Sequence, residues 1–261
     1  MAVVSALYVY PIKSCRGVRV DHWPVVERGF EADRRWMIVD EAGTFVSQRE
    51  LPRLALVTTA LENDLIRVAG PGLAPLYLPR QYEGGEPRAV RVWSDQSRGS
   101  VHALGSAWFS EYLGAPHQLV YMPDNERRAV NPTRARPGDI VSFADGYPFL
   151  LISEASLEAL NARLPEPIPM ERFRPNIVVS GVEPFAEDEF ASVRLGELSF
   201  RGVKRCDRCP VTTVDLETGE PGKEPLRTLA TFRRWDGKVW FGMNMIHDGP
   251  GRLRVGDAVR L

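Results

Sequence analysis

Two of the three cysteines stand three residues apart in a basic segment, at Cys206 and Cys209. Lys204, Arg205 and Arg208 flank them, and nearby positive charge favours the thiolate over the thiol. A thiolate attacks electrophiles and binds soft metal ions. The pattern leaves three roles open, with Cys209 as the residue that does chemistry: a redox dithiol, half of a zinc site, or a single thiolate ligand to a metal cofactor.

The surrounding sequence weighs against two of these roles. A structural zinc ion is usually held by four nitrogen or sulfur ligands, and Cys15 is the only further cysteine. In thioredoxin-like enzymes the motif opens a helix, whereas residues 210–214 (PVTTV) are rich in β-branched side chains and predict a strand. From this segment alone, two inert cysteines in a strand remain an alternative.

Other common chemistries lack their motifs. The sequence contains no glycine-rich phosphate loop, no G-x-G-x-x-G dinucleotide motif and no H-E-x-x-H zinc helix. The four histidines lie far apart and show no ligand spacing, and no nucleophilic serine motif is present. Nucleotide-binding, zinc-protease and serine-hydrolase chemistry are therefore disfavoured.

The composition is that of an ordinary globular protein. The 261 residues are 44% hydrophobic and 26% charged, with a net charge of −1, so we expect no binding to nucleic acid or to anionic membranes. Three cysteines do not form a disulfide framework, which points to a reducing cytoplasm. No segment approaches the roughly 18 apolar residues of a membrane span, and we expect a cytoplasmic protein.

Short strands should position the cysteine segment. The 21 prolines favour many short elements joined by turns. Apolar and polar residues alternate at residues 5–10 and 35–39, as in strands. Turn residues at 40–43 and 62–64 predict two hairpins, 36–39 with 44–47 and 56–61 with 65–68.

Three segments show helical spacing. Residues 104–113 place Leu104, Trp108 and Tyr112 on one face before Gly114. Ser153 can cap a second helix that carries a leucine stripe at positions 157, 160 and 164, after a buried strand at 149–152. Residues 225–234 predict a third helix.

A loop rich in arginine and proline at residues 123–138 divides the chain. We expect a strand-rich N-terminal domain at residues 1–120 and a second domain at residues 121–261. With few short helices, this predicts an α+β fold that is mainly β.

Distinctive short motifs occur from one end of the chain to the other. The cysteine pair is followed by Thr212-Thr213-Val214 and an acidic, glycine-containing turn. The further motifs are YPIKSCRG at residues 10–17, DRRW at 33–36, FVSQR at 45–49, PFLLISEAS at 148–156, RFRPNI at 172–177, FG at 241–242 and VGD at 255–257. In this order they resemble the molybdenum cofactor sulfurase C-terminal (MOSC) domain family, in the branch of the mitochondrial amidoxime reducing component and its bacterial relatives.

This resemblance implies a strand-rich N-terminal lobe and a β-barrel-like MOSC lobe, with molybdenum-molybdopterin between them. It implies that Cys209 ligates the molybdenum, while Cys206 is a neighbour. A soft thiolate suits a metal that already carries sulfur ligands. The residues that correspond to cofactor-binding positions are Lys13, Ser14, Arg34, Arg174, Asn176 and Arg208.

Four positions depart from the family pattern. Asp207 stands where relatives can have serine, Gly146 and Tyr147 where animal relatives have small hydroxyl residues, and Asn244 where the animal enzymes have tyrosine. An acid beside a bound oxyanion is unfavourable, so we expect Asp207 to turn away from the cofactor or to meet Arg205.

The resemblance also implies an activity. The protein would be an oxidoreductase that reduces N-hydroxylated compounds, such as amidoximes and hydroxylamino bases, with electrons from a separate flavin, haem or ferredoxin-type protein, because the chain lacks the cysteines of the iron–sulfur domain that some bacterial relatives carry. The alternative is a non-catalytic cofactor-binding or sulfur-carrier module with a persulfide on Cys209. Pyridoxal phosphate binding is a further association of the family.

Overall fold

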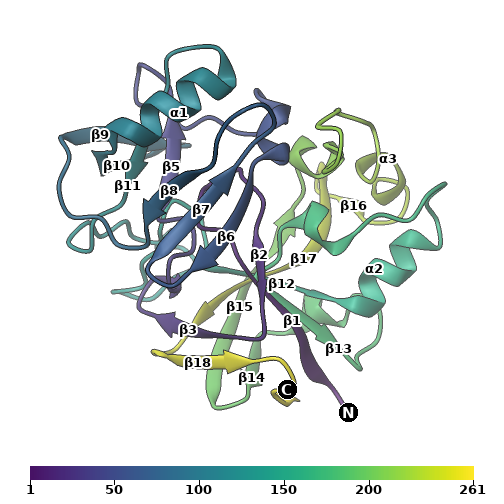
Figure 1. The fold of residues 1–261 in the computed structure, drawn as a ribbon. Coiled ribbons are helices and arrows are strands. Elements are labelled where there is room, and N and C mark those ends of the chain that lie inside the picture. Colours follow the sequence, from purple (N-terminus) through teal and green to yellow (C-terminus); the bar gives the residue numbers. More distant parts are fainter.

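The computed structural model describes residues 1–261 and is built mainly of strands, which confirms a mainly β, α+β fold (Figure 1). The strands are β1 (Val3–Val9), β2 (Val18–Val20), β3 (His22–Val26), β4 (Gly29–Phe30), β5 (Trp36–Val39), β6 (Thr58–Glu62), β7 (Leu65–Ala69), β8 (Leu76–Pro79), β9 (Pro87–Val92), β10 (Asp95–Val101), β11 (Gln118–Tyr121), β12 (Phe149–Ser153), β13 (Ile177–Ser180), β14 (Ser192–Leu195), β15 (Leu198–Asp207), β16 (Arg234–Trp235), β17 (Lys238–His247), β18 (Gly251–Arg254) and β19 (Val259–Arg260). The helices are α1 (Ala103–Leu113), α2 (Glu154–Asn161) and α3 (Leu226–Leu229), with 3-10 turns η1 (Pro52–Leu56), η2 (Met170–Phe173), η3 (Ala186–Glu189) and η4 (Pro210–Thr213).

The largest sheet joins both ends of the chain. Its strand order is β19-β14-β15-β17-β12-β13-β1-β2, with β16 paired to β17. Strand β1 runs antiparallel to β13, so the chain's first strand lies within a sheet otherwise formed mostly by residues after 148 (Figure 1). Strands β1 and β2 precede residue 120 but belong to the sheet formed mostly by residues after it. The domain boundary expected near residue 120 therefore stays a prediction.

Three smaller sheets complete the fold, and two of them form the N-terminal part. Their orders are β5-β11-β10-β9 and β6-β7-β8, while β18-β3-β4 joins residues from both ends of the chain. Helix α1 lies beside β11 in the N-terminal part, whereas α2 and α3 lie on the other side of the molecule (Figure 1). No helix of the structure is long and apolar enough to span a membrane.

Strand β12 is buried on both faces, which explains why its sequence is a continuous apolar run. Phe149 and Leu151 belong to a cluster of 16 buried residues, contributed mainly by the large sheet and the sheet β18-β3-β4. Leu150 and Ile152 point the other way, into a cluster with residues of α2 and α3. The large sheet therefore has a fixed register where it approaches the cysteine segment.

Of the two predicted hairpins, the one at residues 56–68 forms, and the one at residues 36–47 forms only in part. Strands β6 and β7 pair as predicted around Asn63, whose φ of 53° suits the turn. After β5 the turn at residues 40–43 forms, but the returning segment makes only an isolated bridge between Val39 and Phe45. Residues 11–13 occupy the rest of that edge of β5, since the Lys13 amide donates to the Trp36 carbonyl at 2.8 Å, while β11 pairs with the opposite edge.

The helix predictions differ in outcome. Helix α1 ends at Gly114 as predicted, but Leu104 is 74% exposed, and the buried face carries Gly105, Phe109 and Tyr112. The missing side chain at Gly105 explains the rotation, because a Cβ there would lie 2.5 Å from Leu119. Helix α3 is shorter than the helix predicted at residues 225–234, and residues 234–235 form β16.

Helix α2 begins at Ser153 as predicted, and a buried carboxylate reinforces its cap. The Ser153 hydroxyl accepts a hydrogen bond from the Ser156 amide at 3.1 Å and donates one to Glu187 at 2.9 Å. Glu187 is fully buried and also accepts from the Ser156 hydroxyl and the Ser153 amide. These bonds attach η3 to the junction of β12 and α2.

Replacing Ser153 by alanine removes the cap and one donor to the buried Glu187. We expect Ser153→Ala to lower the free energy of unfolding by about 2 kcal/mol, measured by urea denaturation. The matched control is Ser192→Ala on the exposed surface of β14, with an expected change within about 0.5 kcal/mol. Equal losses in the two variants would contradict the capping role.

Candidate functional site

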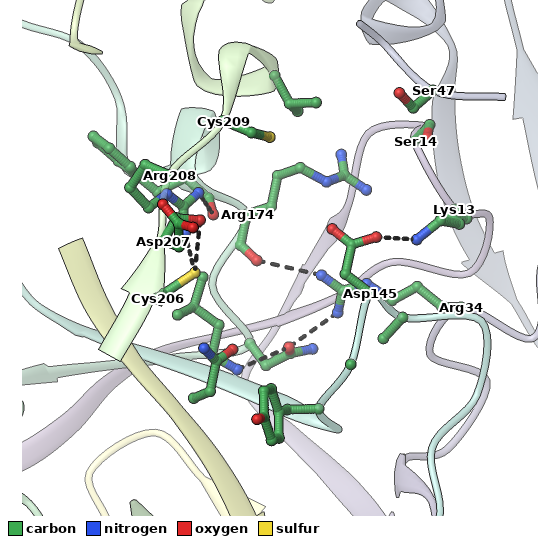
Figure 2. Close-up of a pocket in the computed structure, with 18 of the residues that line it drawn as sticks. Lys13, Ser14, Arg34, Ser47, Asp145, Arg174, Cys206, Asp207, Arg208 and Cys209 are labelled. Atoms are coloured by element: carbon green, nitrogen blue, oxygen red, sulfur yellow. Dashed lines mark hydrogen bonds and ion pairs between the residues drawn. The ribbon is translucent and has the colours of Figure 1, made fainter. Parts of the chain in front are cut away.

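All seven site residues predicted from sequence line one open pocket (Figure 2). They are Lys13, Ser14, Arg34, Arg174, Asn176, Arg208 and Cys209. The pocket also contains Cys206, Asp207 and the departing positions Gly146, Tyr147 and Asn244. Residues separated by almost 200 positions in the chain thus meet at one place.

Loops at the ends of strands deliver these side chains. Lys13 and Ser14 follow β1, Arg174 and Asn176 precede β13, and Cys209 follows β15. Because β1 and β13 are antiparallel neighbours, the end of one lies beside the start of the other. Leu150 of β12 and Asn244 of β17 are register partners, and both line the pocket.

Three of the predicted residues have an unusual backbone conformation. Ser14, Arg34 and Arg174 have φ values of 71°, 48° and 57°, in the left-handed region that non-glycine residues seldom adopt. Only eight non-glycine residues of the chain have positive φ. Such strain persists where surrounding contacts impose it, and it concentrates at functional sites.

A buried polar network imposes the position of Arg34. Its guanidinium donates to Asp33 at 2.7 Å and to the Asn176 side-chain carbonyl at 2.9 Å. Asp33 in turn accepts from the Tyr10 amide at 2.8 Å and from the Asn176 amide group at 3.1 Å. Burial raises the pKa of Asp33, and Arg34 opposes that shift. Asn176 therefore acts on Arg34 and on the backbone of β1.

Arg174 and Arg208 form no ion pair, unlike the other three cations of the pocket. Arg174 donates one hydrogen bond, to the Cys15 carbonyl at 2.6 Å, and its guanidinium lies 4.5 Å from the centre of the Tyr10 ring. Burial lowers its pKa, and the neighbouring Arg34 adds to that shift. Arg208 donates to the Phe173 carbonyl at 2.7 Å, and its Nε has no partner. The pocket therefore holds two guanidinium groups that form no ion pair with an acidic side chain.

The two cysteines are in different environments. Arg208 donates to the Cys206 sulfur at 2.9 Å, so the basic flank acts on Cys206 and leaves Cys209 facing the pocket (Figure 2). Burial nevertheless raises the pKa of the Cys206 thiol, since Arg208 offsets only part of that effect. Fully buried Cys15 has its pKa raised to about 12. Cys206 is thus a poor source of thiolate at neutral pH.

The strand predicted at residues 210–214 is wrong. The segment forms η4, a 3-10 turn that starts directly after Cys209. The Thr212 and Thr213 hydroxyls donate to the carbonyls of Cys209 and Pro210, at 3.1 and 2.8 Å. Such local bonds compete with strand pairing, and proline at the first position fits a helical turn. The motif therefore does follow a strand and open a helical turn, so this argument against a redox dithiol does not hold.

Asp145 is a pocket residue that the sequence analysis missed. Its carboxylate accepts a hydrogen bond from the ammonium of Lys13, and its side chain is 66% exposed to the open pocket whereas that of Lys13 is 7% exposed. Removal from water raises the pKa of the Asp145 carboxyl. The charge and hydrogen bond of Lys13 outweigh that effect and hold the pKa below its usual range. Burial lowers the pKa of Lys13 against the effect of Asp145. Its place just before Gly146 and Tyr147 was the only signal in the sequence.

Asp207 has a partner other than the one expected. It forms an ion pair with Lys238 at 3.3 Å, while Arg205 pairs with Glu189 at 2.6 Å. Strand register explains this difference, because Asp207 lies opposite Trp240, near the start of β17, where Lys238 is within reach. Asp207 is therefore neutralised, but by a different cation.

The charges and donors of the pocket suit an anionic ligand that ends at a soft metal. Five cationic residues line it against two acidic residues, and Arg174 and Arg208 are unpaired. A phosphate needs such cationic forks, and a metal bound by sulfur suits the thiolate of Cys209. The residues present therefore fit a molybdopterin-type group.

Comparisons with known proteins agree with the architecture. Residues 1–116 match the model of the MOSC N-terminal beta barrel domain, and residues 138–260 match that of the MOSC domain. The chain is 36% identical to mitochondrial amidoxime reducing component 2 of Rattus norvegicus, over 99% of this chain and 83% of that protein. It is 33% identical to mitochondrial amidoxime-reducing component 1 of Homo sapiens, over 100% and 83%.

A third relative shares only part of its length with this chain. The molybdenum cofactor sulfurase of Oryza sativa subsp. japonica is 30% identical over 92% of this chain, but the match spans 32% of that protein. The two matched domains and the two amidoxime reducing components, each matched over 83% of its length, agree on the family. The chain belongs to the MOSC domain family, with an N-terminal MOSC β-barrel domain followed by a MOSC domain.

Proposed function

We propose that this protein is a molybdenum-cofactor-dependent oxidoreductase that reduces N-hydroxylated compounds. The observation that carries the proposal is the pair of arginines without acidic partners, Arg174 and Arg208, in the same pocket as Cys209. The names of the full-length relatives supply the reaction class, since two of them are amidoxime reducing components. Pyridoxal phosphate binding stays a prediction.

The cofactor would be held by residues with separate tasks. Cys209 would provide a thiolate ligand to molybdenum. Arg174 and Arg208 would bind anionic groups through charge-assisted hydrogen bonds, while Lys13 and Ser14 would contact the cofactor from the loop after β1. Arg34 would be presented by Asp33 and Asn176, which already satisfy its other donors.

The reaction has a simple balance. An amidoxime takes up two electrons and two protons, its N–O bond breaks, and an amidine and water form. When bound, the molybdenum cofactor supplies the two-electron reduction. The chain's own residues hold the reactants and exclude competing charges. Asp145 does not supply a proton at neutral pH, because Lys13 holds its carboxyl in the ionised form.

We propose that electrons come from a separate flavin, haem or ferredoxin-type protein and that the protein works in the cytoplasm. The alternative is a sulfur carrier with a persulfide on Cys209, and the partial match to a molybdenum cofactor sulfurase supports keeping it. Mass spectrometry of the intact protein distinguishes the two. A persulfide without molybdenum supports the carrier, and bound molybdopterin with turnover supports the reductase.

Replacing Cys209 should abolish activity. We expect Cys209→Ala to lower the reduction of benzamidoxime with reduced methyl viologen by at least about 100-fold, because the metal loses its protein ligand. Cys206→Ala is the matched control, and its activity should stay within about threefold. Full activity of Cys209→Ala would contradict the proposed mechanism. Inactivity of Cys206→Ala would favour a dithiol enzyme.

Removing the charge of Arg174 should weaken cofactor retention. We expect Arg174→Gln to reduce the molybdenum and pterin content of protein purified from a cofactor-competent host by about tenfold, the effect of one lost charge-assisted hydrogen bond. Arg194→Gln alters an exposed arginine of β14, away from the pocket, and should retain the wild-type content. Equal content in both variants would refute the role of Arg174.

The three thiols should differ in their reaction with iodoacetamide. Because burial raises the pKa of Cys15 and Cys206, their thiolates form only at higher pH than that of an ordinary thiol. We expect labelling of cofactor-free protein at pH 8 to concentrate on Cys209, and labelling of the other two to rise as the pH increases. Peptide mass spectrometry measures this, and faster labelling of Cys206 would contradict the assigned environments.

A further inference from the structure

A tryptophan occupies a turn position that favours glycine. Strands β9 and β10 pair up to Val92 and Asp95, so Trp93 and Ser94 form the two-residue turn between them. Trp93 has a φ of 57°. In such hairpins a positive φ at the first turn position usually selects glycine, and a bulky residue there is an outlier. The chain places glycine at fourteen other positions of positive φ.

The Trp93 side chain lies outside the lining of the pocket but packs against two residues that line it. The Arg49 guanidinium lies 4.2 Å from the centre of the indole, and the Phe45 ring packs against it at 5.2 Å with an interplanar angle of 63°. Phe45 and Arg49 both line the pocket. We call Phe45, Arg49 and Trp93 the aromatic rim.

The rim is open, whereas the predicted cofactor anchors are enclosed. Trp93 is 50% exposed, while Lys13, Ser14 and Asn176 are 6%, 7% and 1% exposed. An indole that served only to fill the core would be covered by neighbouring side chains. The free surface of Trp93 is therefore available to a ligand that also contacts the lining residues Phe45 and Arg49.

The neighbouring charge indicates what kind of ligand fits. Asp145 also lines the pocket, and the Trp93 indole helps to lower the pKa of its carboxyl, after the larger effect of Lys13. A flat apolar surface thus lies next to an ionised carboxylate. Aromatic rings gain free energy by packing on an indole, and N–H groups of an amidoxime or amidine can donate to the carboxylate.

We propose that the aromatic rim binds the ring of aromatic N-hydroxylated substrates and that Trp93 is a specificity-determining residue. This inference rests on the proposed function and names the part of the pocket that selects among its substrates. Small aliphatic amidoximes would not reach the rim, so their reduction would not depend on Trp93.

The test compares Trp93→Gly with Trp93→Phe, using benzamidoxime and acetamidoxime as substrates and reduced methyl viologen as donor. Glycine suits the turn, so Trp93→Gly is not expected to unfold the protein. It should raise the KM for benzamidoxime about tenfold and leave kcat, and both constants for acetamidoxime, within about twofold. Trp93→Phe keeps a ring and should stay within about threefold for both substrates. Tyr77→Ala, at a similarly exposed aromatic residue of β8, is the control.

Three outcomes overturn the inference. The first is an equal change for both substrates, and the second is no change for either substrate. The third is loss of molybdenum and pterin from Trp93→Gly, which would assign the rim to the cofactor. Calorimetry with benzamidine and acetamidine separates this inference from the proposed function. If the wild-type protein reduces no N-hydroxylated compound, the proposed function fails. The rim is still supported if Trp93→Gly binds benzamidine more weakly than the wild-type protein does and binds acetamidine equally well.

Discussion

The buried hydrogen-bonded pair of Asp33 and Arg34, bridged by Asn176, is the interaction on which the site depends. It connects the end of β1 and the start of β13, which are neighbours in the large sheet, to the loop before β5, a strand of another sheet. A buried carboxylate is tolerated here because a guanidinium, an amide group and a backbone amide all donate to it. Loss of Arg34 would leave the buried charge of Asp33 uncompensated, and loss of an amide donor would remove one of its hydrogen bonds.

This network also explains how the pocket can concentrate positive charge. Arg34 and Arg174 stack on the same Tyr10 ring, at 4.2 and 4.5 Å from its centre, and Arg34 donates to the Arg174 carbonyl at 3.3 Å. Asp33 neutralises the first guanidinium, so the second can remain without an acidic partner next to it. Burial and, after it, repulsion by Arg34 lower the pKa of Arg174, and both are the energetic cost of keeping a free cation for a ligand.

The residues selected from the sequence lie together in one pocket, whereas several predictions of the local structure around them are wrong. The seven predicted residues meet in one pocket because ordered motifs carry their identities, whatever conformation each segment adopts. The strand predicted after Cys209 failed because threonine hydroxyls bond to the nearby backbone. The buried face of α1 was displaced by a contact between Gly105 and Leu119, and Asp145 was missed because its role comes from Lys13, more than 130 residues away. These are tertiary effects, which neither residue spacing nor propensity encodes.

The left-handed backbone at Ser14, Arg34 and Arg174 has a thermodynamic consequence for ligand capture. Folding holds these residues in conformations that a free chain seldom samples, and the hydrogen bonds of the scaffold stabilise them. A ligand that enters the folded protein then has little backbone to order, so less of its interaction free energy is lost on binding. The folded apoprotein would thus act as a preorganised receptor, and the ligand would be inserted after folding instead of serving as the nucleus of the fold.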